Sequence, residues 1–370
     1  MTSVSLITKR TIKLPTIYDV AKLAGVSPKT VSRALNGDAP VAESTLTKVQ
    51  AAIKSLGYVP SRAAQSMRSN KSGLVGLITG AISVSTSNSQ GPAGLPDLYI
   101  VQGIQKAFQD SGYTLMIADT GNDQARIPNL IDTFVNHRAE GLIITAEFLQ
   151  QIAIPTSVKQ PPTILVNCFD ALQTACVIPN DYEGEYKLVE RLITEGHSRI
   201  AYLTLSGSLH ATAERTLGYR DALLKAGIEF DPRLLLQGED PYEANDENIT
   251  STALESLLSL DEPPTVICCG NDKLAMRCYG MLRARGVKIP DDMSIAGYDD
   301  YLSISTMLFP PLTTVELPYF RMGETAAKGL IEKIKTPESD LPTCTKVSGS
   351  IIWRSSVNAI KNKQNGETTC

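Results

Sequence analysis

The sequence is poor in the residues that build metal sites and disulfide frameworks. Its 370 residues include only three histidines, and no two of the seven cysteines are spaced as a CxxC pair. Structural zinc sites and small disulfide scaffolds both depend on closely spaced ligands of this kind. We therefore expect no metal, no cofactor and no disulfide framework, and we expect the cysteines to be free thiols in a reducing compartment.

Long apolar runs are also missing. No stretch approaches the roughly 20 residues that a membrane-spanning helix needs, and residues 1–14 lack the apolar core of a signal peptide. The patterns GxGxxG, GxxxxGK[ST], GxSxG and HExxH, which mark several classes of enzyme, do not occur. These absences predict a cytoplasmic protein without a membrane partner and without enzyme activity.

What is present is an ordinary globular composition with an uneven distribution of charge. Hydrophobic residues make up 42% of the chain, and the length fits two or three domains. Residues 1–71 carry 11 basic and three acidic side chains, a net charge of +8, which leaves −12 on the remaining 299 residues. A basic head on an acidic body predicts that the head meets a polyanion.

Residues 16–36 show the pattern of two short helices joined by a tight turn. Apolar residues recur at helical spacing after Thr16, which predicts an N-cap there and a helix end near Gly25. Ser27 predicts a second N-cap, with Pro28 at the first position of the next helix. The outer face of this second helix is polar and basic, which is typical of a helix-turn-helix, and a third amphipathic helix is predicted over 42–57.

The residues TIYDVAKLAGVSPKTVSRALNG in this region resemble the N-terminal signature of the LacI/GalR family of transcriptional regulators. The stretch VAESTLTKVQAAIKSLGYVPSRAAQSMRS continues the match, and the resemblance extends over nearly the whole chain. It implies a repressor, controlled by a small-molecule effector, that binds pseudo-palindromic double-stranded operator DNA. The C-terminal tail, 359–370, has no leucine heptads, so we expect a homodimer and not a tetramer.

The second helix is where we expect the operator to be recognised. Arg33 has the geometry for a bidentate contact to guanine, and Lys29 reaches a guanine or a phosphate. By the resemblance, Pro28 and Lys29 hold the two positions that the family varies to choose its operator. Short polar side chains facing outward suit phosphate contacts. The complete set of expected DNA contacts in the head is Thr16, Tyr18, Ser27, Pro28, Lys29, Thr30, Ser32, Arg33 and Asn36.

Residues 61–71 correspond to the family's hinge helix, which folds on the operator and enters the minor groove. Met67 stands where relatives usually have a leucine that wedges apart a base step, and a methionine also suits this role. Ala64 would lie close to the groove floor. A plain linker between domains is the alternative explanation of this segment.

After residue 72, apolar strand-like runs alternate with helical stretches, which predicts βαβ units and parallel sheets. Their number is too large for one compact sheet, so two lobes are expected. This fits the family's effector domain, which resembles periplasmic sugar-binding proteins, with lobes of about 72–178 plus 317–345 and 179–316 plus 346–358. The predicted fold is thus an all-α helix-turn-helix head (15–60), a hinge (61–71) and a two-lobed α/β body with parallel sheets (72–358).

Ligands of such sheets bind at the carboxyl ends of the strands, here in a cleft between the lobes. Matching motifs gives six candidate effector-binding residues: Thr79, Asn167, Phe169, Arg215, Asn271 and Asp299. Planar amide, guanidinium and carboxylate groups suit a polyhydroxylated ligand, most simply a saccharide. Asparagine and aspartate after strands also form turns and helix caps, and that alternative stays open.

Two departures from the family pattern leave the effector's identity open. Leu317 replaces a glutamine that is common in relatives, and the loop 82–98 is long and rich in serine, glycine and proline. A nucleoside or another polar metabolite is therefore an alternative effector. A sugar-binding transport protein with the same body is an alternative function, and the basic head argues against it.

Overall fold

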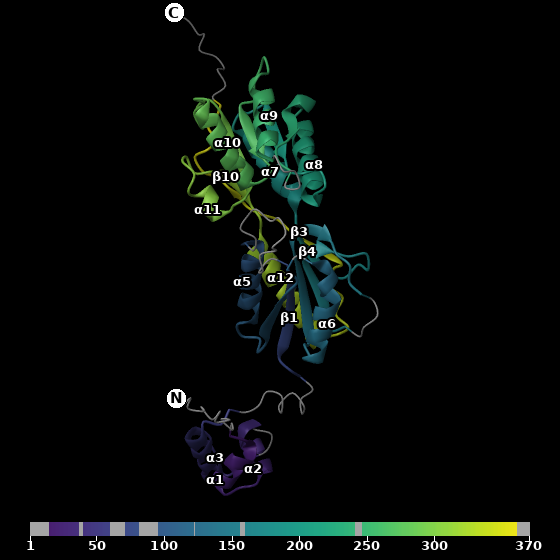
Figure 1. Cartoon of the computed structure of the whole chain (residues 1–370), viewed down its shortest axis with the longest axis vertical. Helices are drawn as coiled ribbons and strands as arrows, with labels where there is room; N and C mark the ends of the chain where they lie inside the picture. Colours follow the sequence, from purple (N-terminus) through teal and green to yellow (C-terminus); the bar gives the residue numbers. More distant parts are fainter. Residues whose placement is uncertain are drawn as a thin grey trace, which may run out of the picture. The chain divides into compact units, whose positions relative to one another are not determined.

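The computed structural model describes residues 15–36, 40–59, 71–80, 95–121, 123–155, 160–240 and 246–360. The chain divides after residue 72 into two compact units, a head and a body (Figure 1). Ala64 and Met67 lie outside the described residues, as do almost all of the proposed hinge, residues 81–94 and the tail after residue 360.

The head consists of three helices, α1 (Ile17–Ala24), α2 (Pro28–Asn36) and α3 (Glu43–Leu56). Their small core is built around Val20, Val31 and Val49, which are almost completely buried. The backbone N–H and the hydroxyl of Thr16 both donate to the carboxylate of Asp19, at 2.8 and 2.7 Å, so the first turn of α1 is closed by a local bond.

The turn between α1 and α2 is built as predicted. Gly25 ends α1 with φ of 67°, a left-handed conformation that a residue without a Cβ adopts at little cost. The Ser27 hydroxyl then accepts the N–H of Thr30 at 3.1 Å and caps α2, with Pro28 in the first helical position. These local signals explain why the two helices begin and end where they do.

The body contains two six-stranded sheets. The first has the strand order β11-β5-β4-β3-β1-β2, and the second has the order β12-β10-β9-β8-β6-β7. The strands of the first are β1 (Leu74–Thr79), β2 (Thr114–Asp119), β3 (Gly141–Gln151), β4 (Thr163–Phe169), β5 (Cys176–Pro179) and β11 (Cys344–Val347). The strands of the second are β6 (Ile200–Thr204), β7 (Leu235–Gln237), β8 (Val266–Cys269), β9 (Ser294–Asp299), β10 (Thr313–Glu316) and β12 (Ile351–Ile352).

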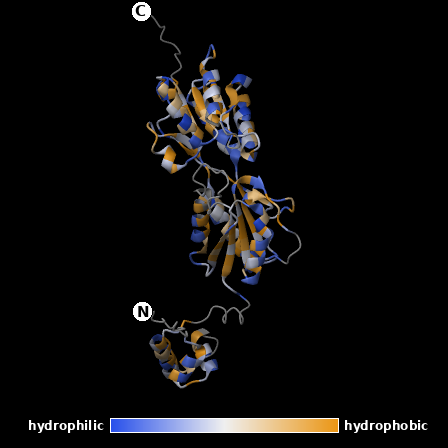
Figure 2. Cartoon of the chain, viewed as in Figure 1, coloured by the Kyte–Doolittle hydropathy of each residue, from blue (hydrophilic) through white to orange (hydrophobic). Residues whose placement is uncertain are grey.

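All neighbouring strands run parallel except β10 and β12, which pair antiparallel. Buried parallel strands need apolar side chains on both faces, and Figure 2 shows the hydrophobic residues concentrated in the strands. The longer helices of the body are α5 (Leu95–Phe108), α6 (Ile127–Asn136), α7 (Asp181–Thr194), α8 (His210–Lys225), α9 (Asp246–Leu258), α10 (Asp272–Ala284) and α12 (Tyr319–Lys335). Short elements are η1 (Gln124–Arg126), η2 (Pro232–Leu234) and α11 (Leu302–Ser305).

The chain passes three times between the lobes, from β5 to α7, from β10 to α12 and from β11 to β12. α12 belongs to the first lobe, since its buried face shares a core with Val75 and Ile104. The strand β11 extends two residues further than the predicted lobe boundary at 345, because Lys346 and Val347 still pair with β5.

Two helices begin earlier than predicted. α5 starts at Leu95, inside the segment 82–98 that was expected to be a loop, and α8 starts at His210, whereas the sequence pattern predicts a helix over 214–226. The residue before α8, Leu209, makes no side-chain cap, so no sequence signal marks this helix start. Arg215 therefore lies in the second turn of α8, whereas a helix that began at Glu214 would have it in the first turn. None of the helices in the described ranges is long and apolar enough to cross a bilayer.

Candidate operator-binding and effector-binding sites

The outer face of α2 presents two cations one turn apart. Lys29 and Arg33 are exposed, and neither makes a hydrogen bond or ion pair within the part of the chain that the structure describes. Pro28 and Thr30 are partly exposed beside them, with the Thr30 hydroxyl 2.9 Å from that of Ser27. Exposed cationic side chains without an intramolecular partner can bind base edges or phosphates.

Further candidate contacts gather at the amino ends of α1 and α2. Thr16 and Ser27 are exposed at these helix starts, and Tyr18 exposes 71% of its surface. Backbone N–H groups at helix starts attract phosphate oxygens, so neutral polar side chains there fit positioning contacts. The backbone of Asn36 ends α2, and its side chain lies outside the described part of the molecule.

Ser32 is buried, although the polar pattern of α2 predicts it on the outer face. It retains only 6% of its exposure, beside the fully buried Val31. The apolar stripe of α2 is therefore wider than the positions of Val31, Ala34 and Leu35 suggested, and it includes one small polar residue. A buried serine between helices cannot touch a phosphate without a rearrangement of the head.

In the first lobe, the candidate residues lie at the carboxyl ends of β1 and β4. Thr79 is the last residue of β1 and is fully buried. Asn167 is 1% exposed, has φ of 57° and donates from Nδ2 to the carbonyl of Ala146 at 3.0 Å. Phe169 ends β4, and its ring meets that of His210 edge-on at 5.5 Å. Because His210 begins α8, this pair joins the two lobes.

In the second lobe, the Arg215 side chain is buried and makes hydrogen bonds within the protein. Its side chain is 4% exposed, Nε donates to Oδ1 of Asp181 at 2.8 Å, and Nη1 donates to the carbonyl of Gly270 at 2.5 Å. The guanidinium carbon lies 3.6 Å from the centre of the Tyr298 ring. Burial alone would lower the pKa of Arg215, but Asp181 and Tyr298 raise it above its usual value, so the residue stays charged.

Asn271 follows β8 and caps α10. Its Oδ1 accepts the N–H of Leu274 at 2.7 Å, and its Nδ2 donates to Oε1 of Glu239 at 2.7 Å. The helix-cap alternative is thus realised in the structure. A ligand could use this amide only through the remaining hydrogen-bonding capacity of its two polar atoms.

Asp299 is the last residue of β9 and has an unusual backbone. Its φ is 119° and that of Asp300 is 49°, two consecutive left-handed conformations at residues other than glycine. The Asp299 carboxylate is partly exposed and accepts no hydrogen bond from any residue in the described ranges. Burial, opposed by Arg215, raises its pKa well above the usual value, and a ligand that donates a hydrogen bond to this carboxylate would stabilise its ionised form.

Two buried acids were missed by sequence reasoning. Asp181 and Glu185 lie one turn apart on α7 and are 2% and 0% exposed. Neither oxygen of Glu185 has a hydrogen-bond partner in the described parts of the chain, and burial raises its pKa to about 8. The sequence does contain a sign that these acids are buried. They are spaced four residues apart and share a helix face with Leu188 and Leu192, which is the apolar face.

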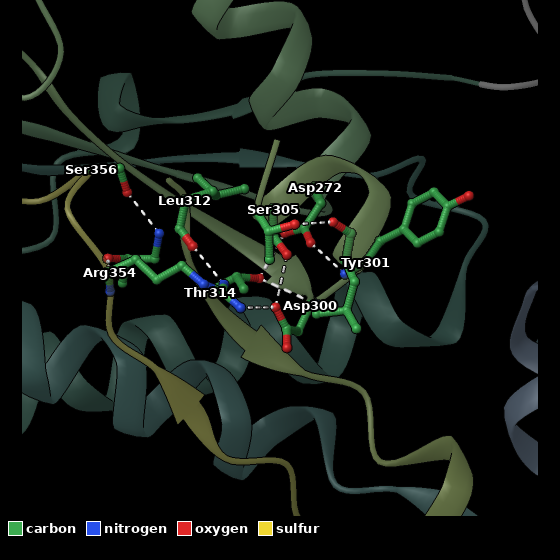
Figure 3. A network of polar contacts seen from close by, with 11 residues as sticks. Asp272, Asp300, Tyr301, Ser305, Leu312, Thr314, Arg354 and Ser356 are labelled. Atoms are coloured by element: carbon green, nitrogen blue, oxygen red, sulfur yellow. Dashed lines mark hydrogen bonds and ion pairs between the residues drawn. The ribbon is translucent and has the colours of Figure 1, made fainter. Parts of the chain in front are cut away.

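A polar network around Asp272 was also missed (Figure 3). It joins the start of α10 to the residues after β9 and to the segment after β12, through Asp272, Asp300 and Arg354. The adjacent Asn271 was singled out from the sequence, whereas nothing local connects Asp272 to its partners Tyr301 and Thr314, which are 29 and 42 positions away. The described residues contain no group of three or more His, Cys, Asp or Glu that could hold a metal ion.

Comparisons with known proteins agree with this architecture. Residues 16–61 match the family model described as bacterial regulatory proteins of the lacI family, and residues 98–352 match that of periplasmic binding proteins and the sugar-binding domain of the LacI family. The HTH-type transcriptional repressor PurR of Vibrio atlanticus is 31% identical over 94% of this chain and 100% of its own length. The ribose operon repressor of Haemophilus influenzae is 28% identical, with the same coverage of both chains.

Among solved structures, the lac repressor dimer bound to operator and an anti-inducer superposes with a TM-score of 0.76. It is 25% identical and covers 94% of this chain and 100% of the repressor. The similarity therefore includes both the helix-turn-helix head and the two-lobed body. Together with the exposed cations of α2 and the polar strand ends of the body, these matches show that the chain belongs to the LacI family of bacterial transcriptional regulators.

Proposed function

We propose that this regulator acts as a homodimeric repressor whose grip on a pseudo-palindromic operator is set by a saccharide bound between its lobes. The observation that carries the effector assignment is the Asp299 carboxylate, which ends β9 partly exposed and accepts no hydrogen bond from any residue in the described ranges, with burial raising its pKa and the charge of Arg215 opposing the rise. A cation and a carboxylate in this arrangement match the alternating donors and acceptors of sugar hydroxyls. Regulation by binding requires no catalytic group, and a protein that binds operator DNA acts in the cytoplasm.

The operator-reading role falls to α2. Lys29 and Arg33 are free to approach base edges, and Pro28 offers a methylene contact in place of a hydrogen bond. Thr16, Tyr18, Ser27 and Thr30 supply positioning contacts to phosphates. The segment 61–71, with Ala64 and Met67, would enter the minor groove and transmit the state of the body to the heads.

Exposed apolar side chains support the homodimer. Met307 and Phe309 each expose 79% of their surface beside α11, with Leu302 at 48% on that helix. The neighbouring helix α10 adds Met276 at 45%. Large apolar patches on a protein surface mark interaction sites. A second copy of the chain, related by a two-fold axis, would cover the same patch on both protomers.

The effector assignment is tested by thermal-shift measurements with D-ribose, D-glucose and adenosine. A compound that binds the folded state raises the melting temperature by mass action. We expect a saccharide to shift the wild type and not the Asp299→Asn variant. A response to adenosine alone would favour the nucleoside alternative, with the Phe169 ring available for stacking, and an unchanged response of Asp299→Asn would show that the site is misplaced.

The DNA-binding role is tested by selecting duplexes from a random double-stranded library with the full-length protein. We expect an enriched site with two inverted half-sites, as a homodimer requires. Enrichment of a single, asymmetric half-site would argue against the dimeric mode. The oligomeric state of Phe309→Ser, measured by light scattering beside that of the wild type, tests the apolar patch directly.

A further inference from the structure

The turn that carries Asp299 has a backbone that its own residues do not favour. Asp299 and Asp300 have positive φ angles of 119° and 49°. Such conformations cost energy in residues with a Cβ and persist only where the surroundings hold them. The turn formed by residues 299–301, called here the 299–301 turn, therefore needs restraints from elsewhere in the fold.

The first restraint is the buried carboxylate of Asp272 at the start of α10. Its Oδ2 accepts the backbone N–H of Tyr301 at 2.7 Å, and its Oδ1 accepts the hydroxyl of Thr314 at 2.6 Å (Figure 3). Asp272 and Thr314 are both fully buried. Gly297 makes room for this carboxylate, because a Cβ at that position would collide with Oδ1.

The second restraint is the ion pair between Asp300 and Arg354. Nη2 of Arg354 donates to Oδ1 of Asp300 at 2.7 Å, and the two side chains are only 16% and 14% exposed. The hydroxyl of Ser305 donates to the same oxygen at 2.9 Å. Nη1 of Arg354 donates to the carbonyl of Leu312, so the guanidinium is anchored at both ends.

These contacts fasten the turn to three separate parts of the second lobe: the start of α10, the beginning of β10 and the segment after β12. We propose that Asp272 and Arg354 are positioning residues that clamp the 299–301 turn and thereby aim the Asp299 carboxylate at the effector, with a clamp that tightens as Asp272 ionises. The assignment of Asp299 to the effector rests on the proposed function; the clamp itself does not.

The ionisation of Asp272 lies in the physiological range. Burial raises its pKa to about 7, while hydrogen bonds from Thr314 and Tyr301 oppose the rise; Asp300 raises the value further and Arg354 lowers it. Asp299 and the buried thiol of Cys269 are the other titratable groups that interact with it. When ionised, Asp272 accepts two charge-assisted hydrogen bonds, which are about twice as strong as neutral ones. The clamp is therefore tighter at pH 8 than at pH 6.

The only tryptophan of the chain reports on the clamp without any effector. Trp353 directly precedes Arg354 and packs partly buried against the core of the second lobe. In the full-length wild type, we expect its fluorescence to change with pH around a midpoint near 7. The change should disappear in Asp272→Asn, and a midpoint that survives unchanged in that variant would overturn the proposal.

A second pair of variants keeps the test decisive if Asp272→Asn folds poorly. Thr314→Val removes a donor to Asp272 and should move the midpoint to higher pH, because the charged form loses a hydrogen bond. Ser305→Ala removes a donor to Asp300 and should leave the midpoint in place. Equal midpoints in Thr314→Val and the wild type would contradict the assignment of the transition to Asp272.

Effector affinity completes the test, with D-ribose, D-glucose and adenosine as probes. We expect Arg354→Met to weaken binding of the responsive compound about ten- to a hundredfold, the effect of losing one charge-assisted hydrogen bond. The matched control is Arg285→Met, which breaks a more exposed ion pair with Glu255 in the same lobe. Equal affinities of the two variants would show that the clamp does not position Asp299. If none of the probes binds the wild type, the proposed effector class is wrong, while the Trp353 titration still decides the clamp.

Discussion

Nε of Arg215 donates a hydrogen bond to Oδ1 of Asp181 across 34 positions of sequence, and the two side chains are 4% and 1% exposed. Arg215, one of the six candidate effector-binding residues, is thus already held by an internal carboxylate, by the Gly270 carbonyl and by the Tyr298 ring. An effector at this site would meet a guanidinium whose orientation is already fixed. It could accept hydrogen bonds only from the N–H groups of Arg215 that Asp181 and Gly270 do not use. This makes Arg215 a structural residue as well as a candidate for binding.

Replacement of Arg215 by methionine should therefore destabilise the body in addition to removing the effector response. Removing one partner of a buried ion pair leaves the other, here the Asp181 carboxylate, without its counter-ion, which costs about 3–5 kcal/mol. Urea unfolding followed by circular dichroism measures the loss. The control, Arg321→Met, breaks the exposed pair with Glu316 and should cost less than about 1 kcal/mol. Similar losses in the two variants would show that the buried pair has no special role in stability.

Glu185 should make the body less stable as the pH rises. Its pKa in the folded protein is about 8, above the usual value of a glutamate, so the unfolded chain gives up this proton at lower pH than the folded one. Below about pH 4.5 this residue does not lower the free energy of unfolding. Between about pH 4.5 and pH 8 it lowers that free energy by about 1.4 kcal/mol per pH unit.

The variant Glu185→Gln should remove this decline. Its melting temperature should exceed that of the wild type at pH 8 by more than it does at pH 5. Glu190→Gln, at an exposed glutamate of the same helix, is the matched control and should leave the pH dependence as it is in the wild type. A wild-type decline that persists in Glu185→Gln would assign it to another group.

Arg33→Ala should weaken binding to the selected operator by about 1–3 kcal/mol and relax the preference at one base pair, since a bidentate contact to guanine would be lost. Lys54→Ala removes an exposed cation from the last turn of α3 and serves as control. Gel-shift titration at fixed salt compares the two. Equal affinities would count against α2 as the recognition helix, and effector binding should be unaffected in both.

Met67→Gly should reduce operator affinity, because an apolar wedge that kinks the minor groove would be lost. Met67→Leu should preserve it, since a leucine of similar volume can fill the same base step. Fluorescence anisotropy with a labelled operator measures both variants. Unchanged binding of Met67→Gly would favour a plain linker over a hinge that contacts DNA.

The head shows how far local signals reach. Thr16, Gly25, Ser27 and Pro28 act within one helical turn, so caps and turns were predicted correctly from the sequence. Ser32 was placed on the wrong side because a helix buries a stripe whose width depends on what packs against it. That width is a property of the three-helix arrangement and not of the periodicity of α2.

In the body, the order of strands and helices was likewise readable, because buried parallel strands are apolar runs whatever their partners. The hydrogen-bond partners of the polar residues could not be predicted from the sequence. Asp272 meets Thr314 at a separation of 42 residues, and Arg354 meets Asp300 at a separation of 54. No periodicity links positions so far apart, so Asp272, Arg354 and Glu185 were absent from the predicted site.

The sequence alone determined the family, the division into a basic head and an acidic body, and the residue types at the ends of the strands, since these depend on local composition and spacing. Only the tertiary structure decided which of those polar groups are already satisfied. It ties Arg215 to Asp181 and uses Asn271 as a helix cap, while it leaves the Asp299 carboxylate without a hydrogen-bond donor in the described part of the chain. The physical reason is that hydrogen-bond satisfaction depends on distances in space, which are set when the sheets and helices pack.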